Sequence, residues 1–155
     1  NPLGTEGHFA LARAAGRRAL SVSARDRIKF ADLVRTEALA SLRGDSLNAG
    51  ALHVLGMWHA EVMRTDVISR TLARAFFKTD MFKVASWNEA QRLMERAVAL
   101  DPDRLVHRMD LAAIYADRGL KAKARATYEA VLAAPVREFN DEVYQRLAAD
   151  RLRKL

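Results

Sequence analysis

The stretch that decides the fold is Ser86–Pro135, SWNEAQRLMERAVALDPDRLVHRMDLAAIYADRGLKAKARATYEAVLAAP. Its small and large apolar residues recur at intervals of three and four, which is the period of one helix face. Asp101-Pro102 divides the stretch, and Asp117-Arg118-Gly119 separates the last two helices. The recurring positions are Ala90, Met94 and Ala97, then Leu111, Ala112 and Tyr115, then Ala124, Tyr128 and Val131. The pattern predicts helices that pack in pairs.

This pattern resembles the tetratricopeptide repeat, a helix–turn–helix unit of about 34 residues. Such units stack into a superhelix with a concave surface, and they bind other molecules more often than they transform them. The resemblance implies an all-α fold, a tetratricopeptide-like helical hairpin solenoid of about three repeats with a C-terminal capping helix.

An earlier unit has the same spacing. Leu55 and Gly56 follow Ser46 by nine and ten residues, as Leu111 and Ala112 follow Pro102. Glycine inside a helix costs about 1 kcal/mol relative to alanine. We therefore expect Gly56 to lie where the paired helix comes too close for a larger side chain.

The earlier unit also carries an insertion. Leu55 precedes Ala90 by 35 residues, whereas Leu111 precedes Ala124 by only 13, so about 22 residues are inserted. The segment 65–85 holds an expected extra helix over 66–78. Insertions in repeat proteins carry specific functions in many cases, but this one could equally close one end of the core.

These signals divide a single domain, 1–155, into repeat units. We expect helices over 5–20 and 25–42, a helix capped by Asn48, a capping box formed by Ser86 and Glu89, and a last helix capped by Asn140. The units are a degenerate repeat over 5–43, a repeat with the inserted helix over 48–100, a repeat over 103–134 and the capping helix over 140–154.

A more specific resemblance rests on His53-Val54-Leu55-Gly56-Met57-Trp58, the insert, Ser86-Trp87-Asn88-Glu89-Ala90 and Asp101-Pro102. This combination resembles the regulator of microtubule dynamics family and its bacterial relatives over about residues 30–150. The resemblance implies a helical domain that binds proteins and has no known catalytic chemistry. Some animal members act at membrane contact sites, and at least one is thought to hold phospholipid.

The resemblance also implies where a partner would bind, because the first helix of each repeat lines the concave groove. The expected groove residues are His53, Met57, Ala60, Glu61 and Arg64 in the second unit, and Met109, Ala113, Ala116 and Asp117 in the third. Repeat domains that clamp a C-terminal carboxylate place lysine, asparagine and arginine at such positions, so this clamp is not expected. Methionines in a groove suit an apolar, adaptable ligand such as a helix or an acyl chain.

The composition excludes several classes of chemistry. The chain has no cysteine, and no run of about 18 apolar residues could span a membrane. We expect no metal site, because His53 and Glu61 are two helix turns apart, and no cofactor, because no phosphate loop or dinucleotide fingerprint is present. Ser21, Ser23 and Ser46 lack a nucleophile elbow, so we expect no catalytic residues and no enzyme.

Trp58 and Trp87 lie in periodic settings that indicate helix packing.

The net charge of +7 allows an acidic partner, but the cations are spread along the chain and interleaved with acids. No aromatic residues alternate with the basic groups as stacking platforms, which argues against nucleic acid. The arginine-rich composition is typical of a bacterial chain. Because the sequence begins with Asn1, we expect a processed or trimmed product, and the choice between an exported or periplasmic and a cytoplasmic location stays open.

The sequence therefore predicts a non-catalytic scaffold or accessory subunit that binds another protein in its concave groove. Two alternatives remain: a carrier of a lipid or apolar small molecule in the same groove, and a basic surface for nucleic acid or an anionic membrane.

Overall fold

The computed structural model describes residues 4–65 and 81–155. These residues form helices and no strand. The helices are α1 (Thr5–Ala19), α2 (Ala24–Gly44), α3 (Ala49–Arg64), α5 (Met81–Val84), α6 (Trp87–Leu100), α7 (Leu105–Asp117), α8 (Lys121–Ala133) and α9 (Asp141–Arg153). The expected all-α helical hairpin solenoid is confirmed. The expected helix over 66–78 lies outside the described residues.

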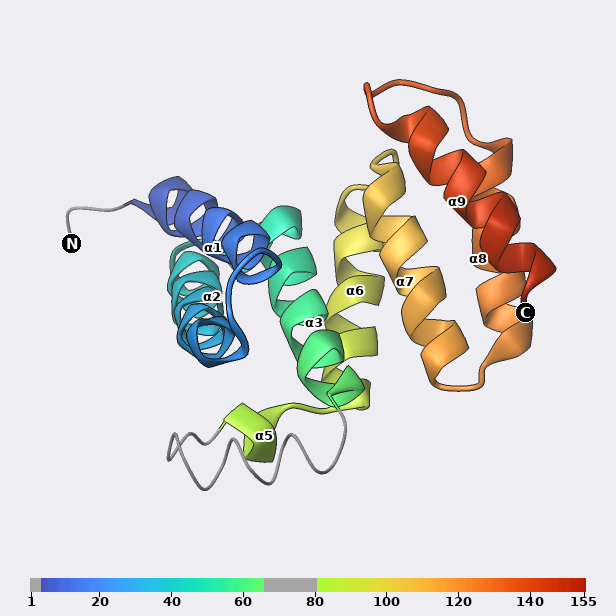
Figure 1. The fold of residues 1–155 in the computed structure, drawn as a ribbon. Helices are drawn as coiled ribbons and strands as arrows, with labels where there is room; N and C mark the ends of the chain where they lie inside the picture. Colours follow the sequence, from blue (N-terminus) through green and yellow to red (C-terminus); the bar gives the residue numbers. More distant parts are fainter. Residues whose placement is uncertain (1–3, 66–80) are drawn as a thin grey trace.

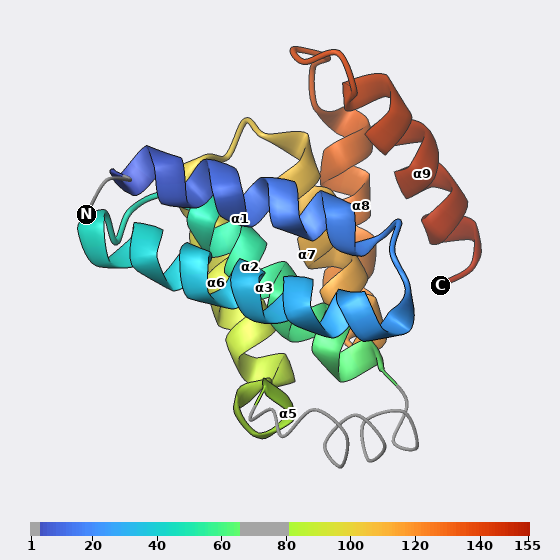
Figure 2. The same ribbon diagram turned by 60° about the vertical axis from the view of Figure 1, so that its left-hand side comes forward.

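The helices pack as successive antiparallel pairs. The main pairs are α1 with α2, α3 with α6, and α7 with α8, and α9 covers the exposed side of the last pair. Figure 1 shows the stack running from α1 and α2 at one end to α9 at the other. Figure 2 shows α1 lying along α2. The first helices of the pairs also contact one another, α1 with α3 and α3 with α7.

The core lies between the paired helices and is continuous through the stack. Its largest fully buried side chains are Tyr128, Met94, Leu105, Ile114 and Val131. Ala90, Ala97, Ala112 and Ala124 are also fully buried, because small residues let neighbouring backbones approach. The alternation of small and large residues in the sequence is thus the packing pattern of the core.

Gly56 lies at the close approach of α3 to α6. A Cβ atom on this residue would lie 3.3 Å from the carbonyl oxygen of Ala90 and 3.4 Å from both the Cβ of Leu93 and the backbone nitrogen of Met94. Two of these three neighbours are backbone atoms of α6. The expectation that a paired helix excludes a side chain at this position is confirmed.

Trp58 belongs to a second cluster of buried side chains, between α1, α2 and α3. It packs with Ala15, Val34 and Val62 and is 4% exposed. Its indole Nε1 donates a 2.7 Å hydrogen bond to the carbonyl oxygen of Ala31. Trp58 therefore ties α3 to α2, as the helix-packing interpretation predicts.

The helix caps agree only in part with those expected from the sequence. The side chains of Asn48 and Ser86 accept hydrogen bonds from the backbone N–H groups of Ala51 and Glu89, as expected. The expected return bond of the capping box, from the Ser86 N–H to the Glu89 side chain, is wrong. The Ser86 N–H donates to His59 Nδ1 at 3.3 Å, and the Glu89 side chain binds Arg92.

The expectation that the Asn140 side chain caps α9 is also wrong. Asn140 makes no side-chain cap bond. The buried carboxylate of the next residue, Asp141, accepts hydrogen bonds from the loop before α9, from the backbone nitrogens of Arg137 at 2.9 Å and Glu138 at 2.8 Å. A carboxylate accepts charge-assisted hydrogen bonds, which are stronger than those of an amide. Asp141 thereby fixes the loop between α8 and α9.

Candidate functional site

The predicted groove residues lie on the facing sides of α3 and α7. One polar link joins the second turns of these helices, where His53 Nε2 lies 2.8 Å from Asp110 Oδ2. The ring of His53 also contacts that of His107, with 4.7 Å between the centroids. His53 is half-buried and held by both contacts, so it is a hydrogen-bonded histidine at the seam between α3 and α7.

A second polar link joins the last turns of the same helices. Arg64 reaches Asp117 Oδ2 with Nη2 at 2.6 Å and Nε at 2.9 Å, and its Nη1 donates to Glu61 at 2.5 Å. Asp117 and Glu61 together raise the pKa of the Arg64 guanidinium against the effect of its burial. Three predicted groove residues thus form one ion cluster.

The apolar residues of the predicted groove lie between the two links. Helix periodicity places Met57 and Ala60 between His53 and Arg64 on α3, and Ala113 between Asp110 and Asp117 on α7. Met57 and Ala113 are half-buried and reach the surface. Ala60 is 0% exposed and Met109 is 8% exposed, so both side chains belong to the core.

The remaining part of this surface comes from α1, which the sequence reasoning did not include. Glu6 accepts a 3.0 Å hydrogen bond from the Asn48 side chain, and the ring of Phe9 lies against Gly50 of α3. Arg13 and Arg17 continue the same stripe of α1 at four-residue intervals, and both are exposed. The four-residue spacing of Phe9, Arg13 and Arg17 in the sequence could have indicated that the three residues share one face of α1.

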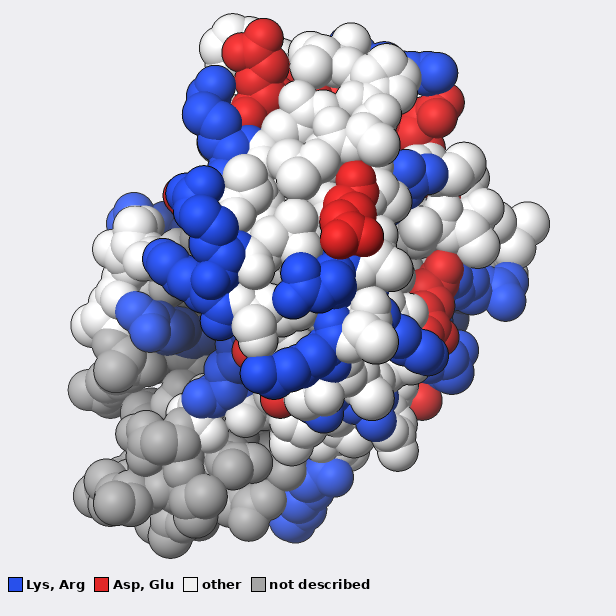
Figure 3. Space-filling view, turned by 90° about the vertical axis from the view of Figure 1, so that its right-hand side faces the viewer, with Lys and Arg blue, Asp and Glu red and all other residues white. Residues whose placement is uncertain are grey.

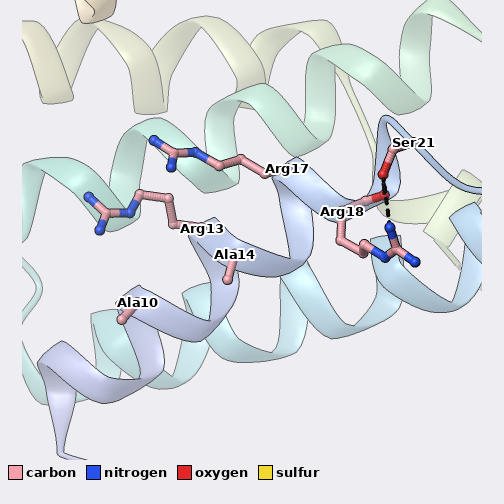
Figure 4. Close-up of a pocket in the computed structure, with 6 residues that line it drawn as sticks. All are labelled: Ala10, Arg13, Ala14, Arg17, Arg18 and Ser21. Atoms are coloured by element: carbon pink, nitrogen blue, oxygen red, sulfur yellow. Dashed lines mark hydrogen bonds between the residues drawn. The ribbon is translucent and has the colours of Figure 1, made fainter.

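Arg13 and Arg17 border a hollow on α1 whose base is formed by Ala10 and Ala14. Figure 4 shows the two side chains extending from α1 in the same direction, while Arg18 turns towards Ser21. The guanidinium of Arg13 lies over the Phe9 ring, 5.4 Å from its centroid. Neither Arg13 nor Arg17 makes an ion pair with any residue that the structure describes.

We call this surface the inner face and define it by Arg13 and Arg17 of α1, Met57, Glu61 and Arg64 of α3, and Ala113 and Asp117 of α7. Its charges are divided: α1 contributes two arginines, whereas Glu61 and Asp117 outnumber Arg64 at the α3–α7 end. The inner face therefore offers a positive end, a short apolar centre and a weakly negative end.

Two buried histidines, His59 and His107, are neutral in the folded chain. Burial, with the nearby charges of His53 and Arg104, lowers the pKa of His107 from 6.5 to about 3. Burial, together with Arg35 and Arg92, also lowers the pKa of His59, although Glu89 opposes this. The N–H of Ser86 donates to His59 Nδ1, so the neutral ring has a structural role as an acceptor.

No group of three or more potential ligands in residues 4–65 and 81–155 could hold a metal ion. None of the described helices combines the length and apolar character of a membrane span. At the α8–α9 end of the stack, Lys and Arg side chains and fewer Asp and Glu side chains lie among uncharged residues (Figure 3). The exposed cations there include Lys121, Lys123, Arg125, Arg151 and Arg153.

Comparison with curated proteins gives no match. The family model for regulator of microtubule dynamics protein 1-3 matches residues 1–155, which is the whole chain. This match agrees with the histidine, leucine-glycine and tryptophan pattern at the start of α3, and extends the resemblance to both ends. The chain belongs to the regulator of microtubule dynamics protein 1-3 family.

Proposed function

We propose that this domain is a non-catalytic interaction module whose inner face binds a segment of a partner protein. The observation that carries the proposal is the arrangement of α3 and α7. Two polar links hold these helices side by side, and the half-buried Met57 and Ala113 lie between the links. A surface that is fixed before binding loses little conformational entropy when a partner docks.

The apolar centre sets the size of what can dock. Methionine is unbranched and adapts its shape to different apolar groups. Ala113 is half-buried and small, so it leaves space for a side chain of the partner. Met57 and Ala113 together suit one or two apolar side chains of a helix or an extended segment, and the surrounding charges set its orientation.

The charges favour a partner segment with acidic residues towards α1. Arg13 and Arg17 are exposed and make no ion pair with a described residue, so a carboxylate can pair with them without displacing an existing partner. Glu61 and Asp117 already bind Arg64, and they favour a basic or neutral group at the opposite end. Charge complementarity of this kind affects the association rate and specificity more than affinity.

We also propose that the hairpins are tetratricopeptide repeat units. Leu55-Gly56 on α3 and Leu111-Ala112 on α7 occupy equivalent positions in the two hairpins; Gly56 faces the second helix of its hairpin, and Ala112 is fully buried. The first helices of such units line the concave side, which is the side that we assign to binding.

Native mass spectrometry of the protein, isolated gently from its own cells, tests the class of ligand. A stoichiometric protein partner supports the proposal. A bound mass of several hundred daltons, released on denaturation, would contradict it and favour a carrier of lipid or another apolar small molecule.

Affinity measurements with that partner test the location of the site. Arg13→Glu together with Arg17→Glu should weaken binding about tenfold, because two attractive charges become repulsive. The matched control is Arg125→Glu together with Arg151→Glu, which changes the net charge equally at exposed positions of α8 and α9. Met57→Gln should weaken binding with little effect on the fold. Equal losses in the α1 and control variants would show that binding depends only on net charge.

A further inference from the structure

A second surface lies between α2 and α6, the second helices of the first two hairpins. Helix α3 packs against both and forms the base of a groove that is open to solvent and encloses about 460 Å³. We call it the outer groove. It does not share a residue with the inner face, so the inference below does not depend on the proposed function.

Leucines form the base and one wall of the outer groove. Leu52 and Leu55 of α3 and Leu93 of α6 are buried below it. Leu39 and Leu42 of α2 are half-buried and line the side of α2. Leu39 and Leu42 lie one helix turn apart, so their side chains form a continuous apolar edge.

Arginines border this apolar surface. Arg35 lies on α2, with its guanidinium 5.6 Å from the centroid of the Trp58 ring, and Arg92 and Arg96 lie one turn apart on α6. Glu89 is the acidic residue among those lining the groove, and it binds Arg92 through Nε at 3.1 Å and Nη2 at 2.8 Å. Three arginines and one glutamate leave a net charge of +2 around the groove.

Arg96 carries the least compensated of these charges. It is exposed and makes no ion pair with a residue that the structure describes, and the acidic residue lining the groove is already bound to Arg92. A cation at the edge of an apolar groove offers a charge-assisted hydrogen bond to an incoming carboxylate.

We propose that the outer groove binds an acidic amphipathic helix of a protein partner. Along α2 the groove extends from Arg35 to Leu42, about 10 Å at 1.5 Å per residue, which matches roughly two turns of a helix. Leucine-like residues of the partner at positions i, i+3 or i+4 and i+7 contact Leu39, Leu42 and the groove base. Glutamates flanking that stripe pair with Arg96 and Arg35.

The test uses the full chain and a designed probe. The probe is a hydrocarbon-stapled, fluorescein-labelled peptide of 14 residues, with leucines at helical spacing flanked by glutamates. Its twin has lysine at every glutamate position, and a scrambled peptide has the same composition without an apolar face. Fluorescence polarisation measures the Kd values. We expect the acidic peptide to bind at least tenfold more tightly than either comparison peptide.

Charge reversal at one residue locates the site. Arg96→Glu should weaken the acidic peptide about tenfold and strengthen the lysine twin. Arg125→Glu, an exposed change of equal charge on α8, should leave both unchanged. The double variant Arg13→Glu and Arg17→Glu should also leave them unchanged, which separates the outer groove from the inner face. Equal losses with Arg96→Glu and Arg125→Glu would overturn the proposal.

Two further experiments test for other ligands of the outer groove, and either result below would overturn the proposal of a helical protein partner. Vesicles of phosphatidic acid and phosphatidylcholine that bind in an Arg96-dependent manner, while the peptide does not, would make the groove a site for anionic lipid. Concentration-dependent self-association in sedimentation velocity that Arg96→Glu abolishes would make a second copy of the chain the occupant.

Discussion

Arg64 and Asp117 connect the last turn of α3 to the last turn of α7, with Nη2 and Nε of the arginine 2.6 and 2.9 Å from the same carboxylate oxygen. The two residues are 53 positions apart in the sequence. Their side chains are 29% and 35% exposed, so water screens the pair only in part. This pair, with the His53–Asp110 contact, fixes the separation of the helices that form the inner face.

A double-mutant cycle with Arg64→Gln and Asp117→Asn should give a coupling energy of about 1 kcal/mol in urea unfolding, because partly buried, charge-assisted bonds exceed exposed ones. The coupling should fall as salt is added. The matched control is the exposed pair Arg92–Glu89 on α6, for which we expect about 0.3 kcal/mol. Equal coupling in the two cycles would show that the link between α3 and α7 contributes no more than an exposed pair.

Two helical glycines should respond in opposite directions to alanine. Gly56→Ala should destabilise the domain by about 1 kcal/mol, because the new methyl group meets backbone atoms of α6 that cannot move independently. Gly16→Ala should stabilise it by about 0.5 kcal/mol, because its Cβ meets only Val34 Cγ2, at an ordinary 3.8 Å. Free energies of unfolding from urea titrations test both. Stabilisation by Gly56→Ala would contradict the close approach of α3 and α6.

The loop before α9 should depend on Asp141 and not on Asn140. Asp141→Ala should cost about 2 kcal/mol, because two backbone N–H groups lose a buried acceptor. Asn140→Ala should change stability by less than about 0.5 kcal/mol, because its exposed side chain makes no cap bond. Thermal and urea unfolding of the two variants measure the difference. A larger loss for Asn140→Ala would restore Asn140 as the cap.

His107 should make the domain less stable as the pH falls. Its pKa is about 3 in the folded chain and 6.5 in the unfolded chain, so the unfolded chain takes up the proton first. The stability that neutral His107 provides is complete above pH 6.5 and declines as the pH falls towards 3, with a limiting slope of about 1.4 kcal/mol per pH unit. His107→Gln removes this titration.

The measurement for His107 is the difference in unfolding free energy between wild type and His107→Gln, taken from pH 7.5 to 4.5. Other titrating groups cancel in this difference, apart from those that His107 itself affects. We expect the stability of the wild type to fall relative to the variant below pH 6.5. A constant difference across this range would contradict the depressed pKa.

Features that depend on local pattern were predictable from the sequence. The apolar spacing around Leu111 and Tyr115 gave the helix pairs, and Asn48 and Ser86 cap helices because a cap involves residues only three positions apart. Gly56 was predictable because an unfavourable residue in a strong helix indicates a packing reason.

Features that depend on how helices face one another were not predictable. Glu89 stands at the reciprocal cap position in the sequence, but the N–H group of Ser86 donates to His59 of the facing helix α3 and not to Glu89. Met109 was expected to line an open groove, yet it is 8% exposed because α7 packs against its neighbours at that point. The repeat pattern assigns a residue to a face, but it does not determine how far neighbouring helices cover that face.

Site-specific photo-crosslinking in the native cell tests most directly whether the inner face binds a protein. The photoreactive residue p-benzoylphenylalanine replaces Arg17 or Glu61, both exposed on the inner face, and Arg125 or Arg151 as controls on α8 and α9. We expect the same protein adduct from Arg17 and Glu61 and its absence from both control positions. Equal adducts at all four positions, or a protein partner that co-purifies but crosslinks only at the controls, would contradict the proposal.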